Sequence, residues 1–232
     1  MKICKVRNGE HFIVDGEEFV KLGDIAGGAF VLLVGTLPGY CPFESQEADD
    51  DRDHNNFIGS NVKWVVDEWL RSHKVLSEAA LARPIDLTSM DGMTDYGMPN
   101  VYGRILTVDE YRKYRRFIPL TDKPFWTATP WCTHSRNGSG AYYVYTDGSV
   151  GSDGVYYASY CARPALALSL LKSWSLWKWR TRRRLFATIL TQNCWTSFCA
   201  GGLKRKPCEM TRSLSQQMIV LKGEKRHGED LS

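Results

Sequence analysis

The chain has 232 residues, of which 43% are hydrophobic and 24% are charged, with a formal net charge of +4. This length and composition predict one globular domain, or one domain with an appendage. The longest apolar stretch, Ala29 to Gly35, is far shorter than the ~20 residues of a membrane span, which excludes a transmembrane helix.

The net charge is divided unevenly along the chain. Residues 1–168 carry 17 Lys and Arg against 22 Asp and Glu, a net of −5, whereas residues 169–232 carry 13 against 4, a net of +9. The pattern therefore predicts a folded acidic domain over 1–168 and a separate basic tail over 169–232.

The cysteines and the N-terminus indicate a reducing site of synthesis. The seven cysteines are an odd number and form no CxxC pair, which argues against a zinc site: Cys4, Cys41, Cys132, Cys161, Cys194, Cys199 and Cys208. Charged residues interrupt the N-terminus, so we expect cytoplasmic synthesis without a signal peptide, and free thiols. The acidic run 49–53 lacks the glycine and distal glutamate of a calcium loop and favours a solvated loop, so no metal or cofactor is expected.

The first elements along the chain read as antiparallel strands. Residues 2–7 and 11–14 are expected to pair across the Asn8-Gly9 turn, since Asn-Gly is a strong hairpin signal. Residues 18–22 and 29–34 are expected to form a second pair that turns through Gly27-Gly28. Together they predict a four-stranded meander.

Two helices follow. Ser60 is a suitable N-cap for a helix that runs to Lys74, and its apolar residues recur every three or four positions. Trp64 lies off that stripe and is expected to pack on an adjoining element. The second helix begins at Thr107, where Thr107 and Glu110 have the spacing of a capping box.

The segment from residue 125 to residue 168 reads as strands joined by turns. We expect strands over 125–129, 141–145, 149–151 and 161–168. Arg163 lies in the last of these, an apolar strand, and a structural ion pair with a buried carboxylate is the expected role.

A polar loop and several tyrosines in this segment are candidates for a binding surface. Tyr, Ser, Asn, Gly and Arg are typical of recognition surfaces, because amphipathic rings supply contact area at little entropic cost. Packing within the core is the alternative for the tyrosines. The predicted ligand-binding residues are Trp131, His134, Ser135, Arg136, Asn137, Tyr142, Tyr156, Tyr157 and Tyr160.

The order of motifs in this segment resembles a known family. It has Trp-Thr-x-Thr-Pro at 126–130, Ala-Tyr-Tyr-Val at 141–144, Asp-Gly-Ser-Val at 147–150 and Arg-Pro-Ala-Leu at 163–166. This order is similar to domain-of-unknown-function family 6273 of gut Firmicutes and their phages. It is also similar to the C-terminal half of C-type-lectin-like domains such as the sulfatase-modifying and Fibrobacter-paralogue families. The resemblance covers roughly residues 10–168, with Cys161-Ala162 in place of the more usual Gly-Val.

The resemblance implies an α+β, C-type-lectin-like domain with antiparallel strands and two helices, followed by a poorly ordered C-terminal tail. It implies a non-enzymatic recognition domain of a gut bacterium or phage, with a glycan or a surface protein as partner. One alternative is a phage virion or tail component, which would be virion-associated. The other is an enzyme related to formylglycine generation, which would use a cysteine pair. Cys132 and Cys161 do not form a recognisable version of that pair, and the chain has no hydrolase, P-loop, dinucleotide or zincin motif.

The basic tail permits several readings. Its interleaved Trp and Arg suit stacking on nucleic-acid bases or insertion at a membrane interface, so nucleic acid is a partner only if the tail is genuine. The lack of periodicity, the scattered cysteines and the reversed charge favour an out-of-frame or unstructured extension. A second folded domain is the remaining alternative.

Overall fold

The computed structural model describes residues 3–44, 54–136 and 138–169. The chain divides into two units, Met1–Arg183 and Arg184–Ser232, and every described residue belongs to the first. The acidic run 49–53 and the basic tail after Ser169 lie outside the described residues, so the predictions made for them stay predictions.

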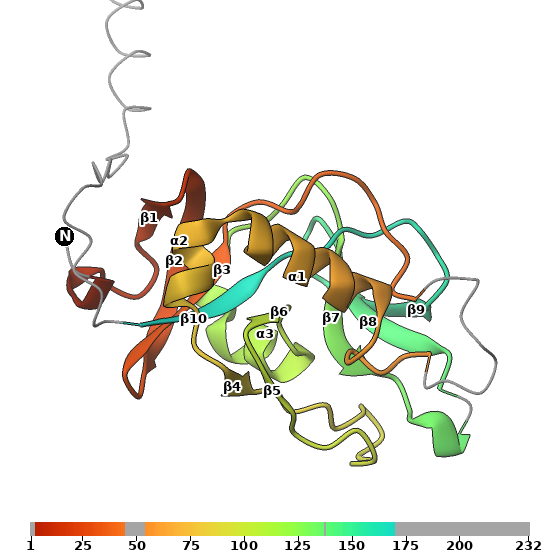
Figure 1. The fold of residues 1–232 in the computed structure, drawn as a ribbon. Helices are drawn as coiled ribbons and strands as arrows, with labels where there is room; N and C mark the ends of the chain where they lie inside the picture. The colour runs from red at the N-terminus through yellow and green to blue at the C-terminus, as the bar shows by residue number, and fades with distance from the viewer. Residues whose placement is uncertain (1–2, 45–53, 137, 170–232) are drawn as a thin grey trace, which may run out of the picture. The chain divides into compact units, whose positions relative to one another are not determined.

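The described residues form a mixed α+β structure with antiparallel sheets and few helices (Figure 1). The strands are β1 His11–Val14, β2 Glu17–Ile25, β3 Gly28–Leu33, β4 Arg83–Pro84, β5 Asn100–Val101, β6 Gly103–Arg104, β7 Phe125–Pro130, β8 Gly140–Val144, β9 Val150–Gly154 and β10 Ala165–Ser169. The helices are α1 Asn61–Ser72, α2 Lys74–Ala79 and α3 Val108–Tyr114, with 3-10 turns η1 Ile3–Lys5, η2 Arg115–Phe117 and η3 His134–Arg136. The α+β class predicted from the sequence is therefore confirmed. No described helix is long and apolar enough to cross a membrane.

The main sheet has the strand order β1-β2-β3-β10-β6. Its first three strands are consecutive in the chain, but the last strand of the described chain, β10, lies between β3 and β6 and pairs antiparallel with both. The predicted four-stranded meander is therefore a three-stranded meander that β10 extends.

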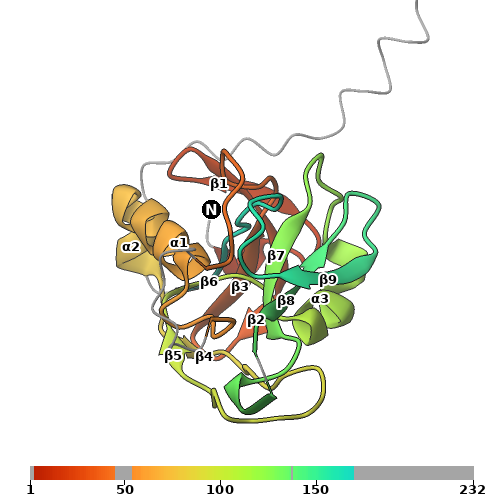
Figure 2. The same cartoon turned by 90° about the vertical axis from the view of Figure 1, so that its right-hand side faces the viewer.

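The main sheet is covered on both faces. Alternate residues of β3 enter two separate core clusters: Val31 and Leu33 lie in the cluster with α1 and α2, and Phe30 and Leu32 lie in the cluster with α3. Figure 2 shows α1 and α2 on one side of the sheet and α3 on the other. A strand buried on both faces needs a continuous apolar run, which accounts for the sequence Ala29–Leu33.

The second sheet, of order β7-β8-β9, supplies the rest of the core. Trp126 of β7 is fully buried, and its indole Nε1 donates a hydrogen bond to the Cys41 carbonyl at 2.9 Å. The Trp126 amide donates to the Cys161 carbonyl at 3.0 Å, so β7 is joined to the segment that leads into β10. The predicted strands over 125–129 and 141–145 are confirmed.

The N-terminal hairpin differs from the prediction. Residues Ile3–Lys5 form a 3-10 turn instead of a strand, and β1 pairs with β2, not with the segment before it. The turn of that hairpin is Asp15-Gly16, where φ is 54° and 86°. Positive φ at both positions is the geometry of a type I′ turn, which Asp-Gly adopts readily. Asn8-Gly9 instead leads the chain from the 3-10 turn into β1.

Both predicted helices are confirmed, and a short third one, α2, follows α1. Ser60 caps α1 by accepting a hydrogen bond from the Lys63 amide at 3.1 Å. The capping box of α3 is present in full, since Thr107 accepts from the Glu110 amide and Glu110 accepts from the Thr107 amide. Trp64, which was expected to pack on an adjoining element, is 59% exposed on α1.

The expected role of Arg163 also needs correction. Its guanidinium is 1% exposed and donates to the carbonyls of Leu33, Val34 and Pro119 at 2.7–3.1 Å, and it lies 4.9 Å from the Phe125 ring centroid. No carboxylate of the described residues pairs with it. Arg163 therefore ties the end of β3 to the loop before β7 through backbone acceptors instead of an ion pair.

Candidate functional site

The candidate site is built around the connection between β7 and β8, which includes η3. The connection is closed at its base because the Trp131 amide donates to the Gly140 carbonyl at 3.0 Å. In Figures 1 and 2 it lies beside the loop over residues 86–97. These two loops, far apart in the sequence, form one end of the fold.

A buried asparagine holds the two loops together. The Asn55 amide nitrogen donates to the carbonyls of Cys132 and Gly140 at 2.7 and 2.8 Å. Its oxygen accepts a hydrogen bond from the Tyr96 hydroxyl at 2.7 Å, and that hydroxyl also accepts from the His134 amide at 3.0 Å. Asn55 is completely buried, so all these bonds form away from water.

The polar side chains of η3 are bonded to the 86–97 loop. The Asp95 carboxylate accepts from the hydroxyls of Thr133 and Ser135, and these bonds hold the pKa of Asp95 below its ordinary value of 3.8. Arg136 lies 3.3 Å from the Asp91 carboxylate. Three predicted ligand residues, His134, Ser135 and Arg136, therefore make interactions that fix the loop, and their polar atoms are only partly available to a ligand.

Two predicted aromatic residues remain open to solvent beside a pocket. Trp131 is 53% exposed and Tyr157 is 59% exposed. The pocket has a volume of about 350 Å³ and is lined by Trp131, Cys132, Ser139, Gly140, Ser152, Asp153 and Gly154.

Two glycines bring the rings close to the sheet. A Cβ at Gly140 would lie 3.5 Å from the Trp131 side chain, and one at Gly154 would lie 3.1 Å from the Tyr157 ring. Both rings therefore lie against bare backbone at the edge of β8 and β9. The result is a small concave surface with aromatic sides and polar groups at its base.

Asp153 is the charged residue among those that line this pocket, but its carboxylate is turned toward the core. One of its oxygens accepts from the Tyr160 hydroxyl at 2.6 Å, and the other accepts from the Gly154 amide at 2.8 Å. Burial, followed by the bond to Asp153, raises the pKa of the Tyr160 phenol well above its ordinary value of 10.0, so Tyr160 stays a protonated donor. Asp153 pairs with the core-facing Ala141, so its side chain lies on the opposite face of the sheet from Ser152.

The remaining predicted residues do not line this pocket. Tyr160 is 6% exposed and packs against Trp126 and Tyr143 at centroid distances of 4.4 and 4.0 Å, so its ring belongs to the core. Tyr142 pairs with Ser152 and points away from the core-facing Ala141, so it lies on the same face of the sheet as the pocket. Tyr156 packs partly against the core and meets the His54 ring edge-on. Asn137 lies outside the described residues.

Sequence reasoning missed the residues that organise the site. Asn55, Asp95 and Tyr96 lie far along the chain from residue 131, and single polar residues in loops carry no periodic signal. The one available signal was the pair of glycines, Gly140 and Gly154, that flank strands rich in tyrosine.

Burial disfavours the thiolate form of three of the described cysteines. Burial raises the pKa of Cys161 and of Cys132, and in Cys132 the Asp91 carboxylate acts in the same direction. Burial, with Cys161 nearby, raises the pKa of Cys41 to about 11. A nucleophilic cysteine needs the opposite shift. Within the described part of the chain, no group of three His, Cys, Asp or Glu side chains is placed to hold a metal ion.

No family model matches the chain, and the searches of curated proteins and of solved structures likewise give no match.

Proposed function

We propose that residues 1–168 form a non-enzymatic recognition domain that binds a carbohydrate at the pocket between Trp131 and Tyr157. The observation that carries the proposal is that two exposed aromatic rings lie against the paired glycines Gly140 and Gly154, beside a pocket floored by backbone. The apolar face of a sugar ring suits an aromatic side chain, and its hydroxyls suit oriented polar groups at the base of a pocket.

The polar side chains of the pocket match the hydroxyls of a sugar. The hydroxyls of Ser139 and Ser152 line the same pocket and can act as donor or acceptor. A pocket of about 350 Å³ is at the lower end of the range for small-molecule sites, which suits one sugar residue of a longer glycan.

The resemblance of the closing segment to C-type-lectin-like domains supports the same class of function. In such a fold the loops of this region present the ligand surface, and here the 131–140 connection, braced by the 86–97 loop, carries Trp131. A C-type-lectin-like domain of a gut bacterium or its phage is the finer assignment that we propose.

A glycan array probed with the full chain tests the function. We expect binding to a restricted set of glycans, and loss of at least about tenfold in affinity in Trp131→Ala and in Tyr157→Ala, because stacked aromatic residues dominate such interfaces.

The matched controls are Trp64→Ala and Tyr40→Ala, which remove equally exposed rings outside the pocket, at 59% and 53% exposure. These two variants are expected to bind as the unchanged chain does. A chain that binds no glycan, or an equal loss in the Trp64 and Trp131 variants, contradicts the proposal.

A further inference from the structure

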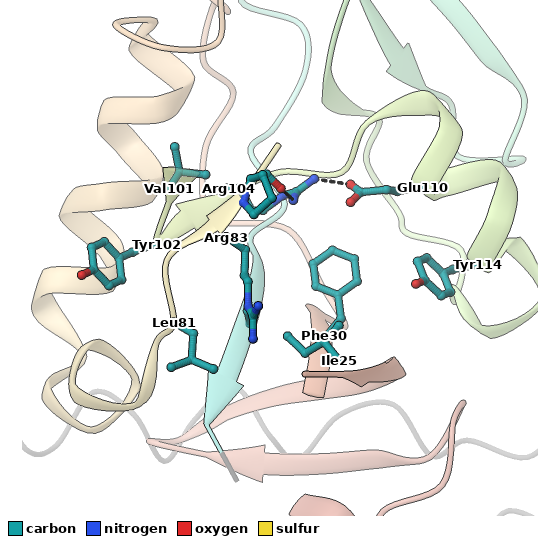
Figure 3. A pocket seen from close by; sticks show the side chains of 11 residues that line it. Ile25, Phe30, Leu81, Arg83, Val101, Tyr102, Arg104, Glu110 and Tyr114 are labelled. Atoms are coloured by element: carbon teal, nitrogen blue, oxygen red, sulfur yellow. Dashed lines mark hydrogen bonds and ion pairs between the residues drawn. The ribbon is translucent and has the colours of Figure 1, made fainter. Parts of the chain in front are cut away.

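A second pocket lies between β4, β6, α3 and the end of the main sheet and shares no lining residue with the pocket at Trp131 (Figure 3). Its volume is about 230 Å³. Phe30, Tyr102 and Tyr114 supply aromatic walls, and Leu81 and Ile25 supply aliphatic ones. The charged groups at this pocket are two arginines and one glutamate.

One arginine and the glutamate neutralise each other. Arg104 is 4% exposed and pairs with Glu110, as the dashed line in Figure 3 marks. Arg104 also donates to the Pro84 carbonyl at 3.1 Å and lies 5.4 Å from the Phe30 ring centroid. Burial lowers the pKa of Arg104, and Glu110 opposes that shift, so the pair is held together in a low-dielectric wall. Its charge is balanced inside the protein.

The other arginine is not balanced. Arg83 donates from one guanidinium nitrogen to the Ala26 carbonyl, and no carboxylate of the described residues pairs with it. Its Nε is buried and has no hydrogen-bond partner among those residues. In Figure 3 the Arg83 side chain extends between Leu81 and Phe30. A buried N–H donor that has no acceptor lowers the stability of the fold, and an anion bound beside it supplies the missing acceptor.

We infer that this pocket binds a small organic carboxylate. The carboxylate accepts from the Arg83 guanidinium, including Nε, and its single negative charge balances the single uncompensated positive charge of the pocket. The body of the ligand lies against Phe30 and Tyr114. At ≈30 Å³ for each water-sized group, the volume admits about eight non-hydrogen atoms.

The walls select a carboxylate over a phosphate. A phosphate carries up to two charges and needs donors on several sides, whereas only Arg83 is free here and the nearby Glu110 carboxylate repels a second negative charge. The remaining walls carry no charge, and apart from the hydroxyls of Tyr102 and Tyr114 their side chains are apolar. A monoanion with a flat or branched apolar body is the ligand class that fits.

Titration calorimetry on the full chain tests the inference with three probes: benzoate, 3-methylbutanoate and 4-methylpentanoate. We expect saturable one-to-one binding of at least one of them, and no binding of its neutral amide or of inorganic phosphate. Arg83→Gln is expected to weaken binding by at least about tenfold, since it removes a charge-assisted hydrogen bond. Arg83 is half-buried and belongs to a two-residue strand, so the variant keeps the core intact.

Two controls make the result specific. Arg116→Gln removes an exposed positive charge of η2 that does not line the pocket, and Trp131→Ala alters the other pocket; both are expected to bind the carboxylate as the unchanged chain does. Tyr102→Ala removes an exposed wall and is expected to weaken binding. Absence of binding by all three carboxylates, equal affinity in Arg83→Gln, or binding of phosphate in their place overturns the inference.

Discussion

Arg163 has a structural role, as the sequence predicts, but its partners are not the expected ones. An arginine in an apolar strand suggests a buried ion pair, but the three acceptors here are backbone carbonyls that end β3 and precede β7. Burial lowers the pKa of Arg163 to about 10, so the guanidinium stays charged at neutral pH. Its role is to satisfy carbonyls that the strands leave without partners.

Replacing Arg163 is therefore expected to destabilise the domain strongly. Arg163→Met removes the donor from three buried or partly buried carbonyls, and we expect a loss of about 3 kcal/mol or more in the free energy of unfolding. Arg163→Lys keeps the charge without the planar fork and is expected to lose an intermediate amount. Urea unfolding measures both, with Arg71→Met on α1, a 62% exposed side chain, as the control. A loss in Arg163→Met no greater than that in Arg71→Met contradicts this role.

The Asp95 carboxylate is expected to make the stability of the fold depend on pH. Its folded pKa lies below the ordinary 3.8 because Thr133 and Ser135 donate to it. A group of lowered pKa stabilises the fold above its unfolded pKa and loses that contribution as the pH falls through the folded value. Asp95→Asn is therefore expected to be less stable than the unchanged chain at pH 6 and to approach it at the acid end. Thermal unfolding from pH 6 to pH 2.5 measures this, and parallel curves would show that the hydrogen bonds do not favour the charged form.

At the scale of elements, two loops define the carbohydrate pocket and Asn55 joins them. Its amide bonds the carbonyls of Cys132 and Gly140, which lie at the two ends of the β7–β8 connection, and its oxygen bonds Tyr96 in the facing loop. The position of the Trp131 ring therefore depends on a residue that does not line the pocket.

Asn55→Ala is expected to loosen this connection and to weaken glycan binding together. It removes two donors from buried carbonyls, which costs about 2–4 kcal/mol in stability. Hydrogen exchange of residues 131–140 is expected to accelerate in the full chain. Asn56→Ala is the matched control, because Asn56 only accepts from the Ile58 amide in an exposed turn. Unchanged exchange in Asn55→Ala would show that the connection is held by other contacts.

The elements that the sequence predicts well are those fixed by neighbouring residues. The Ser60 cap, the Thr107–Glu110 capping box and the Asp147-Gly148 turn depend on residues within a few positions of one another. The strand order does not depend on neighbouring residues. β10 pairs with β3 and β6 in the main sheet, although it lies more than a hundred residues after β3 in the chain.

The same distinction applies to the candidate site. Composition identified the polar loop and the exposed Trp131 and Tyr157, but it did not separate them from Tyr160, which has similar neighbours in sequence and a buried ring. Tyr160 is buried because its ring packs against Trp126 of β7 and Tyr143 of β8. The bracing residues Asn55 and Asp95 follow from the fold alone.

In the whole molecule, the last described strand is central to the main sheet. β10 lies between β3 and β6 and pairs with both, and Leu166 and Leu168 belong to the first core cluster. The change in charge and periodicity predicts a domain boundary after this strand, and that boundary stays a prediction because the residues after Ser169 lie outside the described part of the chain.

A chain ending at Ser169 is therefore expected to fold and to unfold in urea with a free energy close to that of residues 1–168 within the full chain. A chain ending at Arg163 lacks β10, so the edges of β3 and β6 stay unpaired and the first core cluster loses Leu166 and Leu168. We therefore expect no cooperative unfolding transition. Near-UV circular dichroism of the two truncations, against the full chain, is the measurement. Failure of the chain ending at Ser169 to fold would show that residues of the basic tail contribute to the domain, and the interpretation of the tail as an extension outside the fold would be wrong.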